Sequence, residues 1–355
     1  MFKRASIVAA AAAVVGIATG AQAATLDDVK ARGVLHCIVN TGLPGFSYTD
    51  ANGNWAGFDA DMCRSVAAAV LGDADKVKFI PATGKTRFTL LNSKEGDVIF
   101  RNTTWTFVRD VDVKLTFIHP TYYDGQGFII RKSKGVKSAK ELDGATVCIQ
   151  TGTTTELNLA DFFRANKIKY TPVPIEDSSE ARKNYLADRC DAYTTDASGL
   201  AATRATFEKP SDHVILPEII SKEPLGPVVR HGDNQWEDIV RWAVFALIQA
   251  EESGVTAANA DEMAKNPPNP DVARLLGAEG DLGAMLGLDK AWALRAIKAR
   301  GNFGEIFESN LGTKTPIGLE RGLNALYTAG GLQYAPPFRL WIKEARRHGA
   351  NPMCC

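Results

Sequence analysis

Short apolar segments alternate with helical patterns along the first two thirds of the chain, and this alternation constrains the fold more than any other feature. Residues 33–39 are apolar and begin at a glycine, which predicts a buried strand. A helix over 59–71 and a strand over 76–81 are expected next. A second helix containing 88–91 then leads to a strand over 96–100. This order predicts a largely parallel sheet covered by helices.

The same alternation starts again after a glycine-containing strand over 122–131. The capping pattern Thr153-Thr-Thr-Glu156 predicts a helix that continues to Phe163, after a strand over 145–150. A helix over 177–188 and a strand over 190–195 complete a second α/β unit, and a strand over 225–230 is expected to lead back to the first unit. From Asn234 onward the apolar spacing is helical, which predicts a helical C-terminal extension.

The first residues have the features of an export signal. Lys3 and Arg4 precede an apolar, alanine-rich run, and Ala21-Gln-Ala23 supplies a cleavage pattern of small residues. The alternative, a membrane-spanning helix, needs about 20 apolar residues, more than this run provides. We therefore predict that residues 1–23 are a signal peptide and that the mature protein is soluble and periplasmic.

The charge balance gives no reason to expect a polyanionic partner. Lys plus Arg and Asp plus Glu each number 41, and removing the signal would take away only Lys3 and Arg4. A nearly neutral chain lacks the basic excess that binds nucleic acids or anionic membranes. No nucleic-acid partner is expected.

Export makes disulfides possible for the six cysteines. Cys37 lies in a predicted strand and Cys63 on the following helix, while Cys148 and Cys190 both lie in predicted strands of the second unit. We predict the pairs Cys37–Cys63 and Cys148–Cys190. The alternative of free, buried thiols stays open. No CxxC or histidine spacing indicates a metal site.

Three polar segments could bind a ligand at the ends of predicted strands. Residues 101–110 combine hydroxyl and amide side chains with Arg109, whose guanidinium fits a carboxylate, although a solvated polar turn would have the same composition. Residues 152–155 open a helix whose free N–H groups favour an anion, although a plain capping box would also explain them. Asp196 could accept a bond from an ammonium group, or simply cap the helix that follows.

Catalytic and cofactor patterns are missing from the sequence. Thr83-Gly-Lys-Thr86 resembles the end of a phosphate loop, but Phe79 occupies the position of the required leading glycine. No GxGxxG follows the first strand, and neither HExxH nor GxSxG occurs. We therefore expect a binding protein without a cofactor rather than an enzyme.

In these segments the sequence resembles the amino-acid-binding proteins of polar amino-acid ABC transporters, and within them the general L-amino-acid-binding branch. The resemblance runs in order along nearly the whole mature chain. Its motifs are Gly57-Phe-Asp-Ala-Asp61, Gly96-Asp-Val98, Arg101-Asn-Thr-Thr-Trp-Thr106, Tyr122-Tyr-Asp-Gly-Gln-Gly-Phe128, Gly152-Thr-Thr-Thr-Glu-Leu157, Arg189-Cys-Asp191, Thr195-Asp196, Gly322-Leu-Asn-Ala-Leu-Tyr327 and Gly331-Leu-Gln-Tyr-Ala-Pro336.

The resemblance implies a two-lobed α/β periplasmic-binding-protein fold of type II. Residues 24–123 and 227–355 would form lobe 1, including the helical extension, and residues 126–222 would form lobe 2. Two strands near 123–127 and 222–226 would form the hinge between them.

The resemblance also implies roles for the polar residues. Arg109 and Thr104 would hold the α-carboxylate of an L-amino acid, with the N–H near Thr154 and its neighbour Thr153 contributing from lobe 2. Asp196 and the carbonyl of Asn102 would take the α-ammonium group. The expected partners are L-amino acids of a broad set, including polar or acidic ones, and the permease subunits of an ABC transporter. The chain is expected to act as a monomer.

Two departures from the wider family concern the walls of the pocket. Leu43 stands where that family often has an aromatic residue, and a second aromatic is replaced near Gly84. Both changes predict a roomier and less selective pocket. The alternative function is an enzyme on the same fold, such as a dehydratase acting on a small carboxylic acid.

Overall fold

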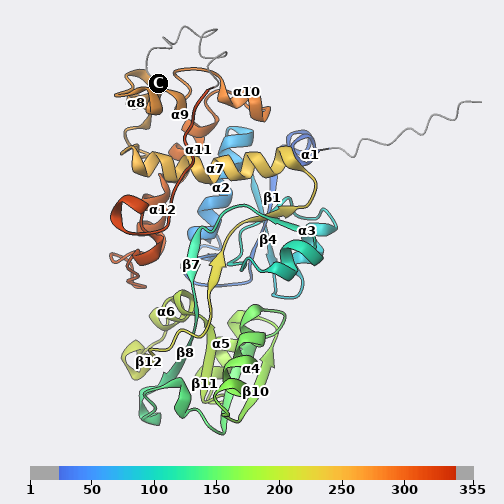
Figure 1. The fold of residues 1–355 in the computed structure, drawn as a ribbon, viewed down its shortest axis with the longest axis vertical. Coiled ribbons are helices and arrows are strands. Elements are labelled where there is room, and N and C mark those ends of the chain that lie inside the picture. Colours follow the sequence, from blue (N-terminus) through green and yellow to red (C-terminus); the bar gives the residue numbers. More distant parts are fainter. Residues whose placement is uncertain (1–23, 341–355) are drawn as a thin grey trace, which may run out of the picture.

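The computed structural model describes residues 24–340, which form two lobes stacked along the long axis of the molecule (Figure 1). Lobe 1 contains one sheet and the C-terminal helices, and lobe 2 contains the other sheet. The predicted signal peptide and the tail cysteines Cys354 and Cys355 lie outside the described residues. Within the described residues, no helix is long and apolar enough to cross a membrane.

Lobe 1 is built on a five-stranded sheet of order β4-β1-β5-β14-β6. Strand β1 is parallel to β4 and β5, whereas β14 is antiparallel to β5 and β6, so the sheet is mixed. The predicted strands and helices of this part are present with small shifts at their ends. The elements are α1 (Thr25–Arg32), β1 (Leu35–Asn40), α2 (Phe58–Leu71), β4 (Val77–Ala82), α3 (Arg87–Asn92), β5 (Val98–Ile99), β6 (Leu115–Phe117) and β14 (Val228–Arg230), with a small hairpin of β2 (Tyr48–Thr49) and β3 (Trp55–Ala56).

Lobe 2 repeats this plan with a sheet of order β10-β9-β11-β8-β12. Strands β10, β9 and β11 are parallel, and β8 is antiparallel to both β11 and β12. The Asp177 side chain caps α5 by accepting from the backbone N–H groups of Ser179 and Glu180, as the sequence predicts. The elements are β8 (Gln126–Arg131), β9 (Ala145–Gln150), α4 (Thr154–Ala165), β10 (Tyr170–Ile175), α5 (Ser178–Leu186), β11 (Ala192–Asp196), α6 (Ala197–Ala205) and β12 (His213–Ile215).

Strand β10 was not expected from the sequence. Its residues include Pro172 and Pro174, and proline has no N–H with which to join a central ladder. The strand is tolerated because it lies at the edge of the sheet and pairs with β9 alone. Its partner, rather than its own composition, therefore decides its conformation.

Two antiparallel strands, β7 (Tyr122–Asp124) and β13 (Glu223–Leu225), connect the lobes and confirm the predicted two-strand hinge. Figure 1 shows both running between the two sheets. The prediction of a single strand over 225–230 is wrong in one respect, because this segment contains the end of β13 (Glu223–Leu225) and a separate strand β14 (Val228–Arg230). Gly226 and Pro227 separate them, and a Cβ at Gly226 would lie 2.4 Å from the His119 carbonyl oxygen, so the chain turns where only glycine fits.

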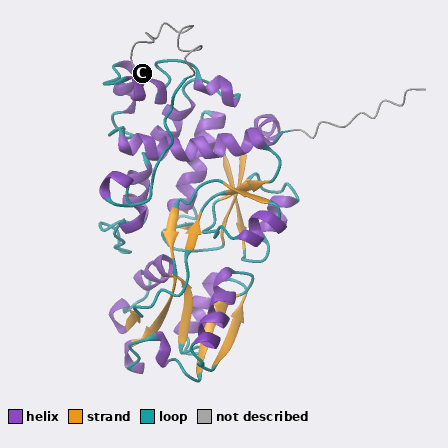
Figure 2. Cartoon of the chain, in the orientation of Figure 1, coloured by secondary structure: helices purple, strands orange, loops and turns teal. Residues whose placement is uncertain are grey.

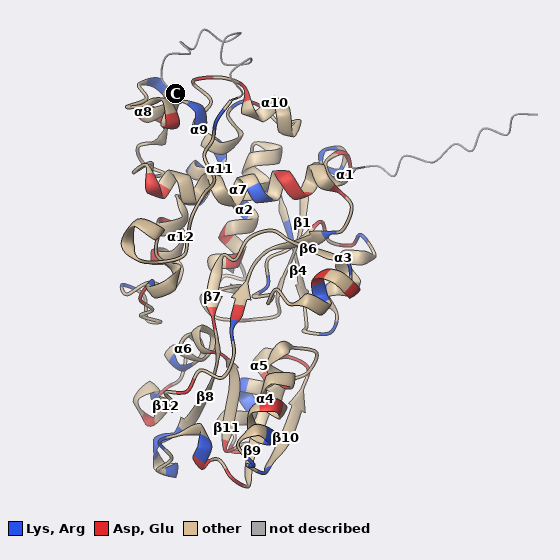
Figure 3. Ribbon diagram, viewed as in Figure 1, with Lys and Arg blue, Asp and Glu red and all other residues tan. Residues whose placement is uncertain are grey.

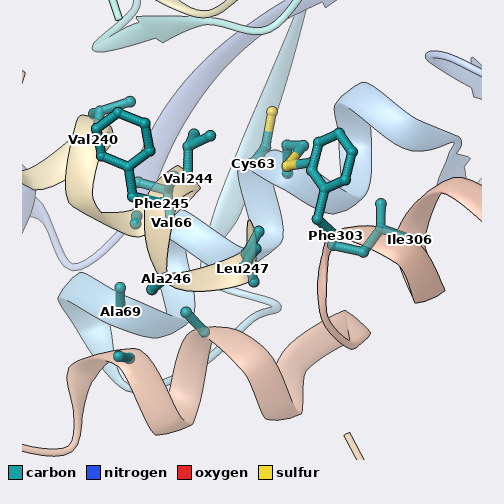
Figure 4. Packing of buried hydrophobic residues seen from close by; sticks show 14 of the residues in the cluster. Cys63, Val66, Ala69, Val240, Val244, Phe245, Ala246, Leu247, Phe303 and Ile306 are labelled. Carbon is teal, nitrogen blue, oxygen red and sulfur yellow. The ribbon is translucent and has the colours of Figure 1, made fainter. Parts of the chain in front are cut away.

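Within residues 234–340, the predicted C-terminal extension is present as six α-helices, which are part of lobe 1 and lie mainly at its end away from lobe 2 (Figure 2). Apolar side chains of α2 and α7 pack together with those of α12 beside Cys63 (Figure 4). This continuous core fixes lobe 1 as one body. The helices are α7 (Asn234–Glu252), α8 (Ala260–Lys265), α9 (Pro270–Leu275), α10 (Leu282–Leu286), α11 (Trp292–Arg300) and α12 (Phe303–Asn310).

Both predicted disulfides are confirmed, and among residues 24–340 each lobe contains one of them. Cys37 of β1 is joined to Cys63 of α2, with Cα atoms 6.2 Å apart. Cys148 of β9 is joined to Cys190, which precedes β11, with Cα atoms 5.6 Å apart. Both bonds therefore tie a sheet to a neighbouring segment of the same lobe.

Candidate functional site

The polar segment after β5 is held in place by hydrogen bonds from lobe 1 itself. Asn102 has a left-handed backbone (φ 34°), and its N–H donates to a carboxylate oxygen of Asp59 at 3.1 Å. The Asn40 side chain at the end of β1 donates to the Asn102 side-chain oxygen at 3.0 Å. These bonds leave the Asn102 NH₂ group facing lobe 2.

Arg109 lies on the short π-helical turn Val108–Asp112 and is nearly buried. Its guanidinium donates to the Thr104 carbonyl at 2.9 Å and lies over the Phe88 ring, 5.3 Å from the centroid. Arg109 is not among the residues that line the cavity between the lobes, but Thr104, whose carbonyl it contacts, is one of them. Burial lowers the pKa of Arg109 to about 10, so the group stays charged at neutral pH.

On lobe 2, Thr153 and Thr154 stand at the start of α4, at the carboxyl end of β9. The predicted capping box is wrong in detail, because the Thr153 side chain caps no helical N–H and donates instead to the Gln150 carbonyl at 2.6 Å. Glu156 accepts from the Gly152 N–H at 3.0 Å. The helix start therefore keeps N–H groups without a side-chain cap, pointing toward the cleft region.

Asp196 ends β11 and occupies the N-cap position of α6, but its side chain makes no capping bond. It accepts instead from the Asn102 NH₂ group at 3.0 Å, across the cleft. The first turn of α6 is capped by the hinge residue Asp124, which accepts from the N–H and hydroxyl of Ser198. The Asp196 carboxyl group is thus free of the structural role that its position could have given it.

These groups meet in a narrow cleft between the lobes. The cavity is lined by side chains of both lobes and has a volume of about 10 Å³, roughly the least space that can hold one water molecule. An amino acid can therefore enter only when the lobes separate. The lining residues are Arg87, Arg101, Asn102, Thr104, Gln150, Thr153, Thr154, Thr155, Thr195 and Asp196.

Direct hydrogen bonds already join the two lobes. Besides the bond between Asn102 and Asp196, the Ser178 hydroxyl of lobe 2 donates to the Asn40 side chain at 2.9 Å. The Thr104 and Thr154 hydroxyl groups lie 3.3 Å apart. The lobes therefore meet through polar side chains that could exchange these partners for a ligand.

Three buried residues of this region were missed by sequence reasoning. Arg87 and Arg101 line the cavity; Arg101 begins one of the quoted motifs but was given no role of its own, and none of those motifs contains Arg87. Glu223 of the hinge accepts from the Thr104 hydroxyl at 2.5 Å and from the Thr154 hydroxyl at 2.9 Å, so it contacts both lobes. Burial of these side chains depends on contacts between distant segments, which local patterns do not report.

Burial and neighbouring charge shift the titration of the acids. Burial, followed by repulsion from Asp124 and Glu223, raises the pKa of Asp196 to about 8. Burial also raises the pKa of Asp59 to about 7, although the Asn102 N–H opposes the shift. In the ligand-free protein both carboxyl groups therefore hold a proton for much of the time at neutral pH.

The residues 35–257 match the bacterial extracellular solute-binding proteins, family 3. The chain belongs to this family. The two mixed sheets, the two-strand hinge and the polar cleft between the lobes are the type II fold that the sequence resemblance predicts.

Individual relatives resemble the chain over most of its length. It is 62% identical over 323 residues to the glutamate/glutamine/aspartate/asparagine-binding protein BztA of Rhodobacter capsulatus, covering 91% of this chain and 96% of that protein. It is 58% identical to the general L-amino acid-binding periplasmic protein AapJ of Rhizobium johnstonii, covering 91% and 95%. A periplasmic binding protein from Brucella ovis with glutathione bound is 56% identical, with a TM-score of 0.87, covering 90% of this chain and 100% of that chain.

These relatives are named as binding proteins rather than as enzymes, and the name of the Brucella ovis protein includes an ABC transporter. The prediction that the chain is a binding protein is therefore confirmed. The dehydratase alternative is not favoured.

Proposed function

We propose that this protein binds L-amino acids in the cleft between its lobes and delivers them to the permease subunits of an ABC transporter. The observation that carries the proposal is the pair of opposite charges offered by different lobes. Arg109 belongs to lobe 1 and donates to the carbonyl of Thr104, which lines the cleft, whereas Asp196 belongs to lobe 2 and lines the cleft itself; both are buried. A zwitterion needs one cation and one anion, so it would be bound fully only when the lobes close.

In this proposal Arg109 and the Thr104 hydroxyl bind the α-carboxylate, assisted by the uncapped N–H groups near Thr153 and Thr154. Asp196 and the Asn102 carbonyl bind the α-ammonium group. The Asn102 NH₂ group would leave Asp196 as the ammonium group arrives. Because each lobe offers only part of these partners, the ligand stabilises the closed state and shifts the population toward it.

The moving bodies in this proposal are residues 24–123 with 227–355, and residues 126–222. The hinge strands β7 and β13 lie between these ranges. The periplasm is the proposed location, because the relative AapJ is named as a periplasmic protein and the first 23 residues have the features of an export signal. We propose that the protein acts as a monomer, since one chain supplies both sides of the cleft.

A thermal-shift panel of the mature protein against the twenty L-amino acids tests the proposal, with sugars, metal ions and dipeptides as controls. A ligand that binds only the folded state raises the melting temperature. Shifts with several L-amino acids and none with the controls are expected. The absence of a shift with every amino acid would overturn the proposed ligand class.

A further inference from the structure

Two motifs of the sequence, residues 322–327 and 331–336, contribute no residue to the lining of the cleft. They lie side by side in lobe 1, because the Tyr327 N–H donates to the Gln333 carbonyl at 2.9 Å. We call residues 321–335, which contain most of both motifs, the strap. Its contacts lie at the hinge between the lobes.

The strap is anchored to helix α7 of lobe 1 at both of its ends. The Arg321 guanidinium donates to the two carboxylate oxygens of Glu251 at 3.0 and 3.1 Å. At the other end, the Ala335 N–H donates to the Glu252 carboxylate at 3.3 Å. Two parallel bonds from a guanidinium to a carboxylate fix direction as well as position. We therefore expect the strap to move with lobe 1.

Between these ends, two buried amide side chains of the strap hold the chain that forms hinge strand β7. The Gln333 amide donates to the Pro120 carbonyl at 3.1 Å, and its oxygen lies 3.1 Å from Nε2 of His119. The Asn324 side-chain oxygen accepts from the Tyr123 N–H at 2.6 Å, and its NH₂ group donates to the Tyr123 carbonyl at 3.3 Å. Asn324 thus satisfies both backbone groups of Tyr123, as a neighbouring strand would.

Lobe 1 holds the outer edge of the other hinge strand, β13, in a similar way. The Pro224 carbonyl accepts from the Trp105 N–H at 2.9 Å, and the Gly226 N–H, just after the strand, donates to the Thr103 carbonyl at 3.0 Å. Residues 103–105 are part of the polar segment that the proposed function assigns to the ligand. The two hinge strands are therefore fixed to lobe 1 on both outer edges, β7 by the strap and β13 by this segment.

Lobe 2 holds the same two strands only a few residues further on. The Gly125 carbonyl accepts from the Ala197 N–H of α6 at 2.7 Å. The Gln126 N–H donates to the Ser221 hydroxyl at 3.2 Å. Lobe 2 thus holds the backbone as far as Gly125 on one strand and Ser221 on the other. The stretch between the two sets of contacts is short on both strands.

We propose that the strap braces the hinge: Asn324 and Gln333 are positioning residues that fix β7 to lobe 1, so that the lobes bend at Asp124 and at residues 222–223. This inference rests on the proposed function, because it assumes that the lobes open to admit an amino acid. A hinge consists of the few residues that absorb the change in backbone angles.

The brace has a consequence for affinity. A hinge with few bending residues has few open arrangements, so little conformational entropy is lost when the lobes close on a ligand. Without Asn324, the backbone of β7 gains freedom in the open state. Closure then costs more for every ligand, and the apparent affinity falls by the same factor for all of them.

Hydrogen–deuterium exchange of the ligand-free protein tests the contact itself. In Asn324→Ala, peptides that contain Tyr123 should exchange roughly three- to tenfold faster, because the Tyr123 N–H loses its acceptor and local opening becomes easier. Peptides from the sheet of lobe 2 should exchange as in the unchanged protein. The melting temperature of the variant without ligand shows whether it is folded.

Isothermal titration calorimetry tests the consequence for binding, with L-glutamate, L-glutamine and L-asparagine, or with other L-amino acids that shift the melting temperature if these three do not bind. Asn324→Ala should weaken each ligand by a common factor of roughly three- to tenfold, with their order of affinity unchanged. A common factor indicates a cost of closure, whereas loss of a ligand contact or a distorted cleft would change the order.

Two further variants keep the test decisive. Gln333→Leu removes the bonds to His119 and Pro120 with a side chain of similar size, and it should shift exchange and affinity in the same direction as Asn324→Ala, whether or not the latter folds. Asn310→Ala is the matched control, since Asn310 is a half-buried asparagine of lobe 1 that donates to the Asp61 carboxylate at 2.9 Å, away from the hinge. It should leave both measurements unchanged.

The possible failures separate the two proposals. If folded strap variants keep the exchange of the β7 peptides or the affinities of the unchanged protein, the proposed function stands and the brace is overturned. A changed order of ligand affinity also overturns it, because the strap would then act on the cleft rather than on the hinge. If the unchanged protein binds no L-amino acid, the proposed function fails, while the exchange measurement still decides whether the strap holds β7.

Discussion

Lobe 1 and lobe 2 are built on sheets of the same order, yet they place different chemical groups at the cleft. Lobe 1 contributes the buried guanidinium groups of Arg87 and Arg101, and the buried Arg109 donates to the carbonyl of Thr104 at the same cleft. Lobe 2 contributes the hydroxyl groups at the start of α4 and the carboxyl group of Asp196. Away from the cleft, residues of both charges are interspersed over both lobes (Figure 3). The two lobes thus share a fold but offer different polar groups to the cleft. A ligand that needs the groups of both lobes binds fully only when the lobes close.

The lobes also differ in how they are stabilised. Lobe 1 has one large apolar cluster that extends into α7, α11 and α12, together with a smaller cluster. Lobe 2 has two small clusters, centred on Phe128 and on Tyr185. A smaller core leaves a smaller margin of stability. Lobe 2 should therefore depend more on its disulfide than lobe 1 does.

Removing the Arg109 charge of lobe 1 should have the largest effect on ligand affinity among the changes that test the difference between the lobes. Arg109→Ala should weaken binding of every L-amino acid more than about 100-fold, because losing one partner of a buried charge pair costs about 3–5 kcal/mol. Titration calorimetry measures the change. Arg241→Ala serves as the control, since Arg241 forms ion pairs with Glu237 and Asp238 of its own helix α7 and should leave binding intact. An unchanged affinity in Arg109→Ala would remove Arg109 from the site.

The disulfides provide a direct test of the difference in stability. Replacing Cys148 and Cys190 by alanine removes a link across 42 residues, which contributes about 4 kcal/mol, close to the value for the 26-residue link between Cys37 and Cys63. Because the core of lobe 2 is smaller, we expect its double variant to show the larger decrease in melting temperature by circular dichroism. An equal or larger decrease in the lobe 1 double variant would contradict this view of the two cores.

The Asp196 carboxyl group of lobe 2 should make binding depend on pH. Its raised pKa, about 8, means that binding an ammonium group at lower pH requires the loss of a proton. Affinity should therefore increase as the pH rises toward 8, by up to about tenfold per pH unit, and level off above it. At pH 8, Asp196→Asn should bind roughly 10–100-fold more weakly, since the ammonium group loses a charged acceptor.

Calorimetry across the pH series, with circular dichroism of the same samples, checks this expectation. Asp196→Asn should have a much flatter pH profile, and any slope that remains would come from groups such as Asp59, whose pKa is about 7. A folded variant with the slope of the unchanged protein would show that Asp196 is not the titrating group. Loss of the folded signal would instead indicate a structural role.

The smallest expected effect concerns the contact between the lobes at Gly84. A Cβ at this position would lie 2.7 Å from the Thr151 carbonyl oxygen of lobe 2, so the closed lobes leave no room for a side chain there. Gly84→Ala should weaken amino-acid binding up to about tenfold, because closure is hindered while each lobe stays intact. An unchanged melting temperature without ligand, measured beside the affinity, separates hindered closure from misfolding. Unchanged affinity would mean that the backbone near Gly84 and Thr151 moves apart at little cost when a side chain is added.

The absence of two aromatic residues predicts a roomier pocket, and this stays a prediction. The structure gives a different explanation for a glycine at position 84, which is the close contact between the lobes. Gly84 and Gly152 face each other across the cleft, and a Cβ on Gly152 would lie 2.7 Å from the Lys85 side chain. Small residues on both sides let the two backbones approach. Leu43 is buried and lies near Gly199 of α6. A Cβ added at Gly199 would lie 3.6 Å from the Leu43 Cδ1 atom.

The sequence by itself determined most of the order of strands and helices, because this order depends on periodicity and caps within short segments. The placement of four cysteines in predicted elements indicated the two disulfides, and the resemblance to the family implied the hinge. The sequence also indicated Asn102, Thr104 and Asp196, since they follow predicted strands, and the structure joins the first and third by a hydrogen bond across 94 residues. Their binding roles stay a proposal.

Only the tertiary structure decided which other charges meet at the cleft. Glu223 reaches Thr104 across 119 residues, and Arg87 and Arg101 become buried only when α3, β5 and lobe 2 come together. An arginine on a short helix has the same local pattern whether it faces water or a closed cleft. Burial of a guanidinium nitrogen without an acceptor is a property of the assembled fold, and it distinguishes Arg87 and Arg101 from the other arginines that the structure describes.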